Sequence, residues 1–239
     1  MKNVLVTGGS RGIGRAIVKA FSEKGYKVEF TYKSSHEEAL TLSKETGAFP
    51  INADSASADA VLSAVKSAEK NLGKIDILIN NAAVSSTNLF TDITLEDWNR
   101  ELNVNLTSAF LYTKETVPGM ISRKWGRIIN ISSMWGVVGA SCEVCYSTAK
   151  AALIGMTKAL AKELGPSGIT VNAIAPGLID TDMNNHLTEE EKNDLIDMTP
   201  MSRIGKTCDV AAAVLFLAGD DASFITGDVL NLSGGFVIY

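Results

Sequence analysis

Short apolar segments alternate with longer helical patterns along the whole chain, and this alternation most strongly limits the possible folds. Each short segment is rich in Val, Ile and Leu and has the length of a strand that is buried on both faces. The stretches between these segments are long enough for helices that cross from one strand to the next. The pattern therefore predicts repeated β-α-β units, which build a parallel sheet with helices on both faces.

The expected strands share an apolar, mostly β-branched character and lie at residues 3–6, 27–32, 49–52, 75–80, 127–132, 170–175 and 229–232. The expected helices lie between them, at residues 12–24, 37–46, 57–71, 95–122, 144–164 and 208–218. Thr94 precedes one of these helices, and Thr188 with Glu191 has the spacing of a capping box. Neither a repeat nor a low-complexity linker interrupts the series, so we predict one domain over residues 1–239.

Residues 178–207 depart from the strict alternation of strands and helices. This stretch is polar and acidic, and a helix inserted there could close over a site as a substrate lid. The residues are equally compatible with a solvated excursion that has no role.

The charge and cysteine content limits the classes of partner. Twenty-two Lys and Arg residues against 27 Asp and Glu residues give a net charge of −5, so the chain has no general attraction to nucleic acid or anionic membranes. Three cysteines are an odd number without a disulfide framework, which is typical of a reducing compartment. Apolar runs stay below the roughly 20 residues of a membrane span. We therefore expect a cytoplasmic protein without nucleic-acid or membrane partners.

Cys142 and Cys145 form a C-x-x-C pair, which can indicate a metal or redox site. A metal site would need two more ligands, and the two histidines, His36 and His186, are distant in sequence. We expect both histidines at the surface. We therefore interpret Cys142 and Cys145 as small residues that happen to lie near a helix start, and we predict no metal site.

A glycine-rich segment, Thr7-Gly8-Gly9-Ser10-Arg11-Gly12-Ile13-Gly14, follows the first expected strand and opens the first expected helix. Glycines at such a turn let the backbone approach a pyrophosphate, and the free N–H groups of the helix start attract anions. The spacing is G-x-x-x-G-x-G rather than the usual dinucleotide fingerprint. Because strand, loop and helix follow in the correct order, nucleotide binding is favoured over a structural turn.

The end of the second expected strand indicates which nucleotide is bound. A carboxylate there would bind the ribose 2′-hydroxyl of NAD, but the chain reads Thr31-Tyr32-Lys33-Ser34-Ser35. Lys33, together with Arg11 in the glycine loop, would instead bind the 2′-phosphate of NADP. The alternative is that both cations are solvated surface residues.

Polar side chains also follow the next two expected strands. Asp54 follows the third, and Asn80-Asn81-Ala82-Ala83 ends the fourth. The carboxyl ends of parallel strands form the edge at which such sheets bind ligands. Taken singly, each of these residues is also a common turn or cap residue.

Tyr146 and Lys150 lie four positions apart at the start of an expected helix, so their side chains share one face. An ammonium group beside a phenol favours the phenolate, which predicts a lowered tyrosine pKa and proton transfer near neutral pH. Ser132 and Ser133 end the fifth expected strand, where a hydroxyl could bind a substrate carbonyl oxygen. By itself the Tyr-Lys pair is also an ordinary pattern of amphipathic helices.

Together these motifs resemble the short-chain dehydrogenase/reductase family over residues 2–235. The resemblance rests on the loop from Thr7 to Gly14, on Asn80 to Ala83, Asn105, Ser133, Tyr146 with Lys150, and Pro176 to Thr181. It implies an α/β fold, with a three-layer, doubly wound parallel sheet of the Rossmann type as a single NADP-binding domain.

The resemblance also implies roles for particular residues. Tyr146 would be the general acid of carbonyl reduction, and Ser133 would polarise the carbonyl. Lys150 would hold the nicotinamide ribose, and Asn105 would anchor a water of a proton relay. The implied cofactor-binding residues are Gly8, Ser10, Arg11, Gly12, Ile13, Gly14, Lys33, Asp54, Ser55, Asn81, Ala82, Tyr146, Lys150, Ile179 and Thr181.

Within the family, the chain is most similar to reductases of 3-oxoacyl thioesters in fatty-acid synthesis. This implies NADPH-dependent reduction of a thioester of acyl-carrier protein or CoA. Lys124 and Ser167 stand where such enzymes tend to place arginines that dock the carrier. The similarity further implies pairing into dimers or tetramers through helices 95–122 and 144–164, with Leu106, Phe110, Leu153 and Met156 as interface or core residues.

Two alternative functions remain from the sequence. One is a dehydrogenase of the same fold that acts on another secondary alcohol or ketone, such as a sterol, a sugar or a small carbonyl compound. The other is a nucleotide-sensing protein without catalysis, which the complete set of Asn105, Ser133, Tyr146 and Lys150 disfavours.

Overall fold

The computed structural model describes residues 2–185 and 187–238, so the expectation for His186 lies outside the described residues. The strands are β1 Asn3–Val6, β2 Lys27–Tyr32, β3 Phe49–Asn52, β4 Ile77–Asn80, β5 Gly126–Ile131, β6 Ile169–Pro176 and β7 Val229–Leu232. The longer helices are α1 Gly12–Glu23, α2 His36–Thr46, α3 Ala58–Leu72, α5 Ser108–Arg123, α7 Val144–Leu164 and α9 Thr207–Ala218. Shorter helices are α4 Leu95–Leu102, α6 Trp135–Val138 and α8 Glu189–Asp197.

The strands form one parallel sheet in the order β3-β2-β1-β4-β5-β6-β7. The chain first builds outward from β1 to β3, then returns to place β4 on the other side of β1. This reversal makes the fold doubly wound and creates a crevice between β1 and β4, where such sheets bind ligands. The predicted fold class is confirmed.

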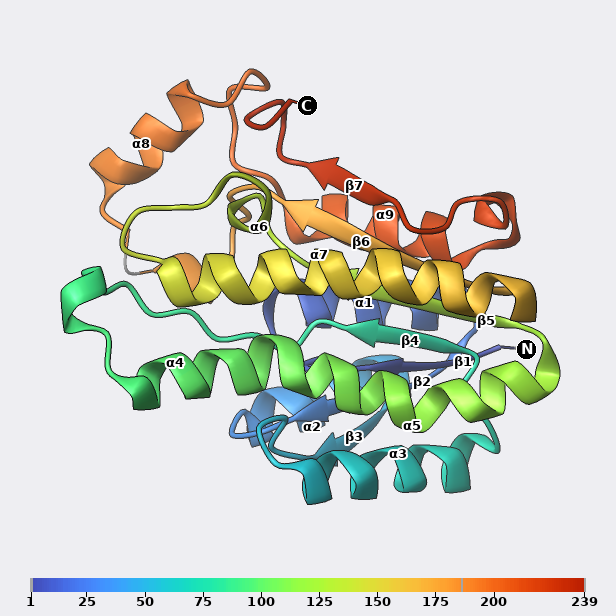
Figure 1. Cartoon of the computed structure of the whole chain (residues 1–239). Coiled ribbons are helices and arrows are strands. Elements are labelled where there is room, and N and C mark those ends of the chain that lie inside the picture. The colour runs from blue at the N-terminus through green and yellow to red at the C-terminus, as the bar shows by residue number, and fades with distance from the viewer. Residues whose placement is uncertain (1, 186, 239) are drawn as a thin grey trace.

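Helices cover both faces of the sheet, as the apolar strands require. Helices α3, α5 and α7 lie in front of the sheet in Figure 1, and side chains such as Val61, Tyr112 and Leu164 pack there against Leu5 and Val171. The opposite face is covered by α1, α2 and α9. Their buried side chains form a second hydrophobic core with the side chains of that face of the sheet. The buried alternating residues of the central strands separate these two cores.

The predicted helix over residues 95–122 is wrong as one continuous element. A π-helical turn, Asn103–Thr107, separates α4 from α5. Inside this turn, the amide of buried Asn105 bonds both backbone polar groups of Val84. Single π-helical turns interrupt α-helices chiefly at functional sites, and this one brings a helix residue to the loop after β4.

The predicted N-caps are confirmed in both short acidic helices. The hydroxyl of Thr94 accepts from the backbone of Asp97, and the Asp97 carboxylate returns the contact. Thr188 and Glu191 form the same reciprocal box at α8. These caps satisfy N–H groups that a helix start leaves without partners, so α8 is defined even though it has no buried residues.

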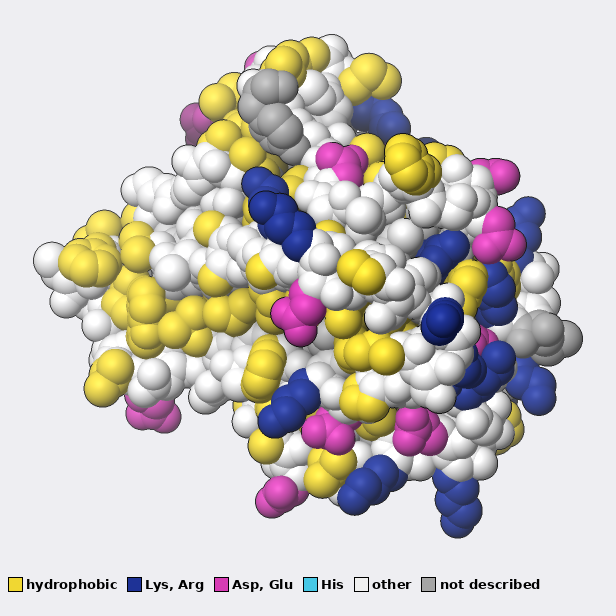
Figure 2. All heavy atoms as spheres, turned by 45° about the vertical axis from the view of Figure 1, so that its right-hand side comes forward, with side chains coloured by type: hydrophobic (Ala, Val, Ile, Leu, Met, Phe, Trp, Pro, Cys, Tyr) yellow, Lys and Arg dark blue, Asp and Glu magenta, His cyan; other side chains and the backbone are white. Residues whose placement is uncertain are grey.

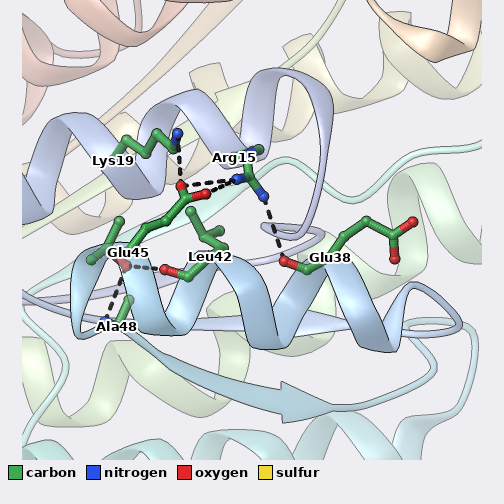
Figure 3. Close-up of polar contacts among 7 residues, drawn as sticks. Arg15, Lys19, Glu38, Leu42, Glu45 and Ala48 are labelled. Atoms are coloured by element: carbon green, nitrogen blue, oxygen red, sulfur yellow. Dashed lines mark hydrogen bonds and ion pairs between the residues drawn. The ribbon is translucent and has the colours of Figure 1, made fainter.

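An ion-pair network ties α1 to α2 (Figure 3). One nitrogen of Arg15 lies 2.9 Å from each carboxylate oxygen of Glu45, and Lys19 lies 2.8 Å from the same carboxylate. Arg15 also donates to the backbone oxygen of Glu38 at 3.4 Å. Exposed ion pairs of this kind contribute about 1 kcal/mol or less each, so the network orients α2 more than it stabilises the fold.

Glu29 in β2 is fully buried, and burial raises its pKa to about 7 from an ordinary value of 4.5, while the Asn71 side chain opposes the rise. The folded protein therefore binds this proton more tightly than the unfolded chain does. Ionised Glu29 therefore lowers the free energy of unfolding. This loss of stability is absent below pH 4.5, the pKa in the unfolded chain, grows as the pH rises towards 7, and is complete above pH 7.

Replacing Glu29 with Gln is therefore expected to stabilise the protein by up to about 3 kcal/mol near pH 8, relative to its effect near pH 4.5. Urea unfolding of both proteins at the two pH values measures this difference. Glu23→Gln, a change at an exposed site on α1, is the control and should show no comparable pH dependence. A Glu29→Gln effect that is the same at both pH values would contradict the expectation.

Candidate active site

A cavity of about 690 Å³ opens at the carboxyl ends of the strands, on the side of the molecule where α4 and α8 lie (Figure 1). Its lining combines the glycine loop, the ends of β2 and β3, the loops after β4 and β5, the start of α7 and the segment after β6. All fifteen residues expected to bind the cofactor line this one cavity. Three of the four expected catalytic residues, Ser133, Tyr146 and Lys150, line it as well.

The glycine loop is packed too closely for side chains. A Cβ atom at Gly14 would lie 2.2 Å from the Gly8 carbonyl oxygen, and one at Gly8 would lie 2.9 Å from the Ala82 Cα. The Asn81 amide donates to the carbonyl oxygens of Thr7 and Gly8 at 2.9 and 3.0 Å, which fixes the loop against β4. The loop is therefore a rigid cradle of main-chain atoms.

The start of α1 lacks a side-chain cap and has no acidic residue in its first turn. Its first N–H groups are available to an anion, and the positive end of the helix dipole lies there. The bare cradle and the uncapped helix start fit the pyrophosphate of a dinucleotide.

The corner at the end of β2 holds a cation in contact with a carboxylate. Lys33 lies 2.7 Å from Asp54, and its side chain is 67% exposed. The hydrogen bond from Lys33, assisted by the Ala56 N–H, holds the pKa of Asp54 below its ordinary value. Arg11, in the glycine loop, is exposed and lines the same cavity. A phosphate bound here would meet two cations, one of which is already shared with Asp54.

Tyr146 lies at the other end of the cavity, almost fully buried on the first turn of α7. Burial raises the pKa of its phenol, the Glu143 and Glu101 charges raise it further, and a hydrogen bond with Ser133 opposes the rise. The Ser133 oxygen accepts from the Trp135 N–H at 3.1 Å, so its own proton is directed elsewhere. This arrangement keeps the phenol protonated and places a second hydroxyl beside it, as carbonyl reduction requires.

Lys150 is fully buried near the Tyr146 ring, and the predicted effect of its charge on the tyrosine pKa is not found. Its Nζ donates to the Ile131 carbonyl at 2.8 Å and lies 5.5 Å from the centre of the Tyr146 ring. Burial lowers the pKa of Lys150 to about 7, so the ammonium is itself disfavoured. The expected lowering of the tyrosine pKa is therefore wrong for this structure, because burial of both groups outweighs their mutual attraction.

Two further residues predicted from the sequence, Asn105 and Ser132, bond the protein backbone around the cavity. Asn105 is buried behind the wall and is not among the lining residues, because Val84 occupies its amide group. Ser132 donates to the Lys150 carbonyl at 2.9 Å, which supports the helix rather than a substrate.

Several residues that line the cavity were not predicted from the sequence. Glu143 precedes Tyr146 by three residues, Arg100 lies in the last turn of α4, and Val104 lies in the π-helical turn that follows. The spacing from Tyr146 could have indicated Glu143, since residues three apart share a helix face. Nothing local marks Arg100 or Val104, because the π-helical turn beside them decides which way they face.

The cysteines and membrane-related features add no second site. All three cysteines are free, Cys145 is buried, and Cys142 has a left-handed backbone with φ of 62°. In the described part of the chain, no group of three or more His, Cys, Asp or Glu side chains could hold a metal ion. None of the helices within residues 2–185 and 187–238 combines the length and apolar character needed to span a bilayer.

Comparisons with known proteins agree with this geometry. A family model described as enoyl-(acyl carrier protein) reductase matches residues 8–237. The 3-oxoacyl-(acyl-carrier-protein) reductase FabG of Staphylococcus aureus is 39% identical over 239 residues, covering 98% of this chain and 97% of the relative. The acetoacetyl-CoA reductase of Rhizobium meliloti is 44% identical over 232 residues, covering 97% and 96%.

A solved structure of a Serratia marcescens short-chain dehydrogenase/reductase, a double mutant, superposes with a TM-score of 0.92 at 38% identity. The match covers 98% of this chain and 97% of the other. Family model, relatives and solved structure thus agree over nearly the full length. The chain belongs to the short-chain dehydrogenase/reductase family and is an oxidoreductase that uses a nicotinamide cofactor.

Proposed function

We propose that this protein reduces 3-oxoacyl thioesters of acyl-carrier protein or CoA to 3-hydroxyacyl thioesters with NADPH, as a step of fatty-acid synthesis. The observation that carries the proposal is that Ser133, Tyr146 and Lys150 line the same cavity as the glycine loop. The printed activities of the two reductases compared above support the thioester as substrate.

Each side chain of the site has a defined task in this proposal. Reduced nicotinamide, when bound, supplies the hydride that the carbonyl carbon accepts. Ser133 donates a hydrogen bond to the carbonyl oxygen, and Tyr146 gives that oxygen its proton. Lys150 holds the nicotinamide ribose. Asn105 anchors the water through which Tyr146 is protonated again, by an atom other than its side-chain amide, which Val84 occupies. The buried, protonated phenol suits the reductive direction, because a general acid must carry its proton when the substrate arrives.

NADPH is favoured over NADH by the two cations at the adenosine end of the cavity, Arg11 and Lys33. The contact between Lys33 and Asp54 limits this preference, because the carboxylate competes with a phosphate for the same ammonium.

Replacing Lys33 with Ala is expected to lower the ratio of kcat/KM for NADPH to that for NADH by about tenfold, through loss of one charge-assisted phosphate contact. Initial rates with both cofactors measure this ratio, and Lys44→Ala on α2 serves as a cation-removal control away from the cavity. An unchanged ratio in Lys33→Ala would show that Lys33 does not bind the 2′-phosphate.

A CoA thioester is the second candidate for the physiological carrier. Identity to the acetoacetyl-CoA reductase is higher than to FabG, 44% against 39%. Lys124 follows α5 and lies two residues before β5, and Ser167 lies two residues before β6, so both stand at the amino edge of the sheet. This edge lies opposite the cavity, so neither residue could hold a carrier at the mouth of its own chain's site.

The direct experiment is a panel of carbonyl compounds with NADPH: acetoacetyl-acyl-carrier protein, acetoacetyl-CoA, free acetoacetate, and ketones of sterol, sugar and small-molecule types. Much higher kcat/KM for the thioesters than for free carbonyl compounds supports the proposal. Weak thioester turnover beside strong turnover of a free ketone would contradict it and favour another alcohol dehydrogenase activity.

We further propose residues 178–207 as a substrate lid within the single domain. Leu187 and Leu195 line the cavity from this segment. Its base is closed by two backbone hydrogen bonds of 2.9 Å, from Gly205 to Leu178 and from Asp180 to Gly205. A segment that is fixed at its base and contacts the cavity above it can move as a unit.

We also propose a homo-oligomer, a dimer or tetramer, in the cytoplasm. Hydrophobic side chains form a band on the face that carries α5 and α7 (Figure 2). Phe110 on this face is 49% exposed, and Leu106 and Met156 are half-buried. Leu153, by contrast, is 1% exposed and belongs to the core of its own chain. The free cysteines fit a reducing compartment.

A further inference from the structure

Residues 84–88, which follow β4, are held at several points and are here called the pocket wall. Val84 and Ser85 line the cavity. Asn105 bonds both backbone polar groups of Val84, at 3.2 and 2.8 Å. The Ser85 hydroxyl donates to Glu143 at 3.2 Å. The pocket wall is thus tied both to the π-helical turn and to the start of α7.

Glu101 adds a contact at the centre of the pocket wall. The Ser86 N–H donates to Glu101 Oε1 at 3.0 Å, and the Ser86 hydroxyl bonds the same oxygen. At the end of the wall, the Asn88 N–H donates to the Cys142 carbonyl at 2.9 Å. Glu101 and Asn105 lie four positions apart, so two successive turns hold Ser86 and Val84.

Glu101 is a buried carboxylate, so its position needs a physical explanation. Its side chain is fully buried, and its other oxygen, Oε2, has no hydrogen-bond partner among the residues that the structure describes. Within residues 2–185 and 187–238, no Lys or Arg forms a salt bridge with it. Burying a carboxylate without a cation is costly, and the end of a helix disfavours a negative charge. Neither solvation nor the helix itself explains a carboxylate here.

The pocket wall compensates for the cost of burying the Glu101 carboxylate, because charge-assisted hydrogen bonds from the Ser86 N–H and hydroxyl are stronger than neutral ones. Glu101 also acts on the proton donor, because its charge adds to that of Glu143 in keeping Tyr146 protonated. The other groups that face Tyr146 are the Ser133 hydroxyl and the buried Lys150.

We propose that Glu101 is a positioning residue of the active site, whose buried carboxylate holds Ser86 and thereby fixes the pocket wall against which the carbonyl substrate binds. The inference rests on the proposed reductase function, since the substrate that meets the wall is the one proposed there. It assigns no new chemical step: Glu101 acts through Ser86 and the wall and does not touch the reacting atoms.

The test compares Glu101→Val, Glu101→Gln and the matched control Glu96→Gln, which removes an exposed carboxylate from the same helix. Glu101→Val removes both acceptors, so KM for acetoacetyl-CoA should rise about tenfold or more while kcat and the NADPH dissociation constant change less than about threefold. Glu101→Gln keeps an oxygen for Ser86 and should hold KM within about threefold of wild type. The control should match wild type.

Amide hydrogen exchange gives a readout that does not depend on turnover. Residues 84–88 should exchange faster in Glu101→Val than in wild type, and Glu101→Gln should restore their protection. Unchanged KM together with unchanged exchange at the wall would overturn the proposal, as would a Glu101→Gln variant that loses as much as Glu101→Val. If wild type reduces no thioester, the proposed function fails, while the exchange comparison still decides whether Glu101 holds the wall.

Ser86→Ala covers the case in which Glu101→Val does not fold. It removes only the hydroxyl donor, so KM should rise about threefold and exchange at the wall should increase in part. A Ser86→Ala protein identical to wild type in both measurements would also overturn the proposal.

Discussion

Replacing Tyr146 with Phe should lower kcat for carbonyl reduction by about a thousandfold or more, at the upper end of what general acid catalysis contributes. The change removes the phenol hydroxyl and leaves the ring in its buried place. The carbonyl oxygen would then have no group from which to take its proton.

The NADPH dissociation constant should stay within about twofold of wild type, because the substitution does not alter the glycine loop or the corner formed by Arg11, Lys33 and Asp54. Steady-state rates with acetoacetyl-CoA, together with fluorescence titration of NADPH, separate the two effects. Tyr26→Phe, which alters a half-buried tyrosine packed on Phe21 away from the cavity, controls for loss of a tyrosine hydroxyl. A Tyr146→Phe protein with more than about a tenth of wild-type kcat would refute its role as the general acid.

The second large effect is expected at the glycine loop. A Cβ atom at Gly14 would lie 2.2 Å from the Gly8 carbonyl oxygen and 2.6 Å from the Asn81 amide nitrogen. Both neighbours are fixed, one as backbone and the other by its hydrogen bonds to Thr7 and Gly8. Gly14→Ala should therefore displace the loop and weaken NADPH binding by about a hundredfold or more.

Isothermal titration with NADPH measures this loss, and thermal unfolding reports the accompanying strain. Gly155→Ala is the matched control, because Gly155 lies in α7 with nothing within 4 Å of the added Cβ. It should bind NADPH as wild type does and melt at an equal or higher temperature. A Gly14→Ala protein that binds NADPH within about threefold of wild type would show that the loop does not form the pyrophosphate site.

The architecture could be predicted from local sequence because each strand carries its own signal. Residues 27–32 and 49–52 are predicted with the bounds that β2 and β3 have in the structure. Strand β4 begins at Ile77, two residues later than predicted, although the backbone of Asp76 still bonds Asn3 and Arg127 on the two neighbouring strands. Alternation of strands and helices then leaves little choice of topology, since parallel strands require crossover connections.

Most residues that line the cavity could also be predicted, because they lie at the carboxyl ends of the predicted strands. What local sequence could not show are the contacts between distant segments. The bond from Ser86 to Glu101 depends on how α4 crosses the loop after β4. The pairing of Lys33 with Asp54 joins segments that follow two different strands. Because of it, the Lys33 ammonium is shared with a carboxylate instead of being free for a phosphate.

The direction of the tyrosine pKa was predicted wrongly for a physical reason. The spacing of Tyr146 and Lys150 shows that the two groups are close, but not that both are buried. Burial disfavours the charged form of each, which raises the pKa of the phenol and lowers that of the ammonium. A Tyr-Lys pair in water and the same pair in this cavity therefore behave oppositely.

The measurement that tests the central proposal most directly is transfer of deuterium from NADPH labelled at nicotinamide C4 to acetoacetyl-CoA. We expect wild type to form a 3-hydroxyacyl thioester with one deuterium at C3, and we expect its rate of formation to fall about a thousandfold or more in Tyr146→Phe. Mass spectrometry of the product detects the label. Labelled NADPH that binds but yields no deuterated thioester, while a free ketone becomes labelled instead, would contradict it.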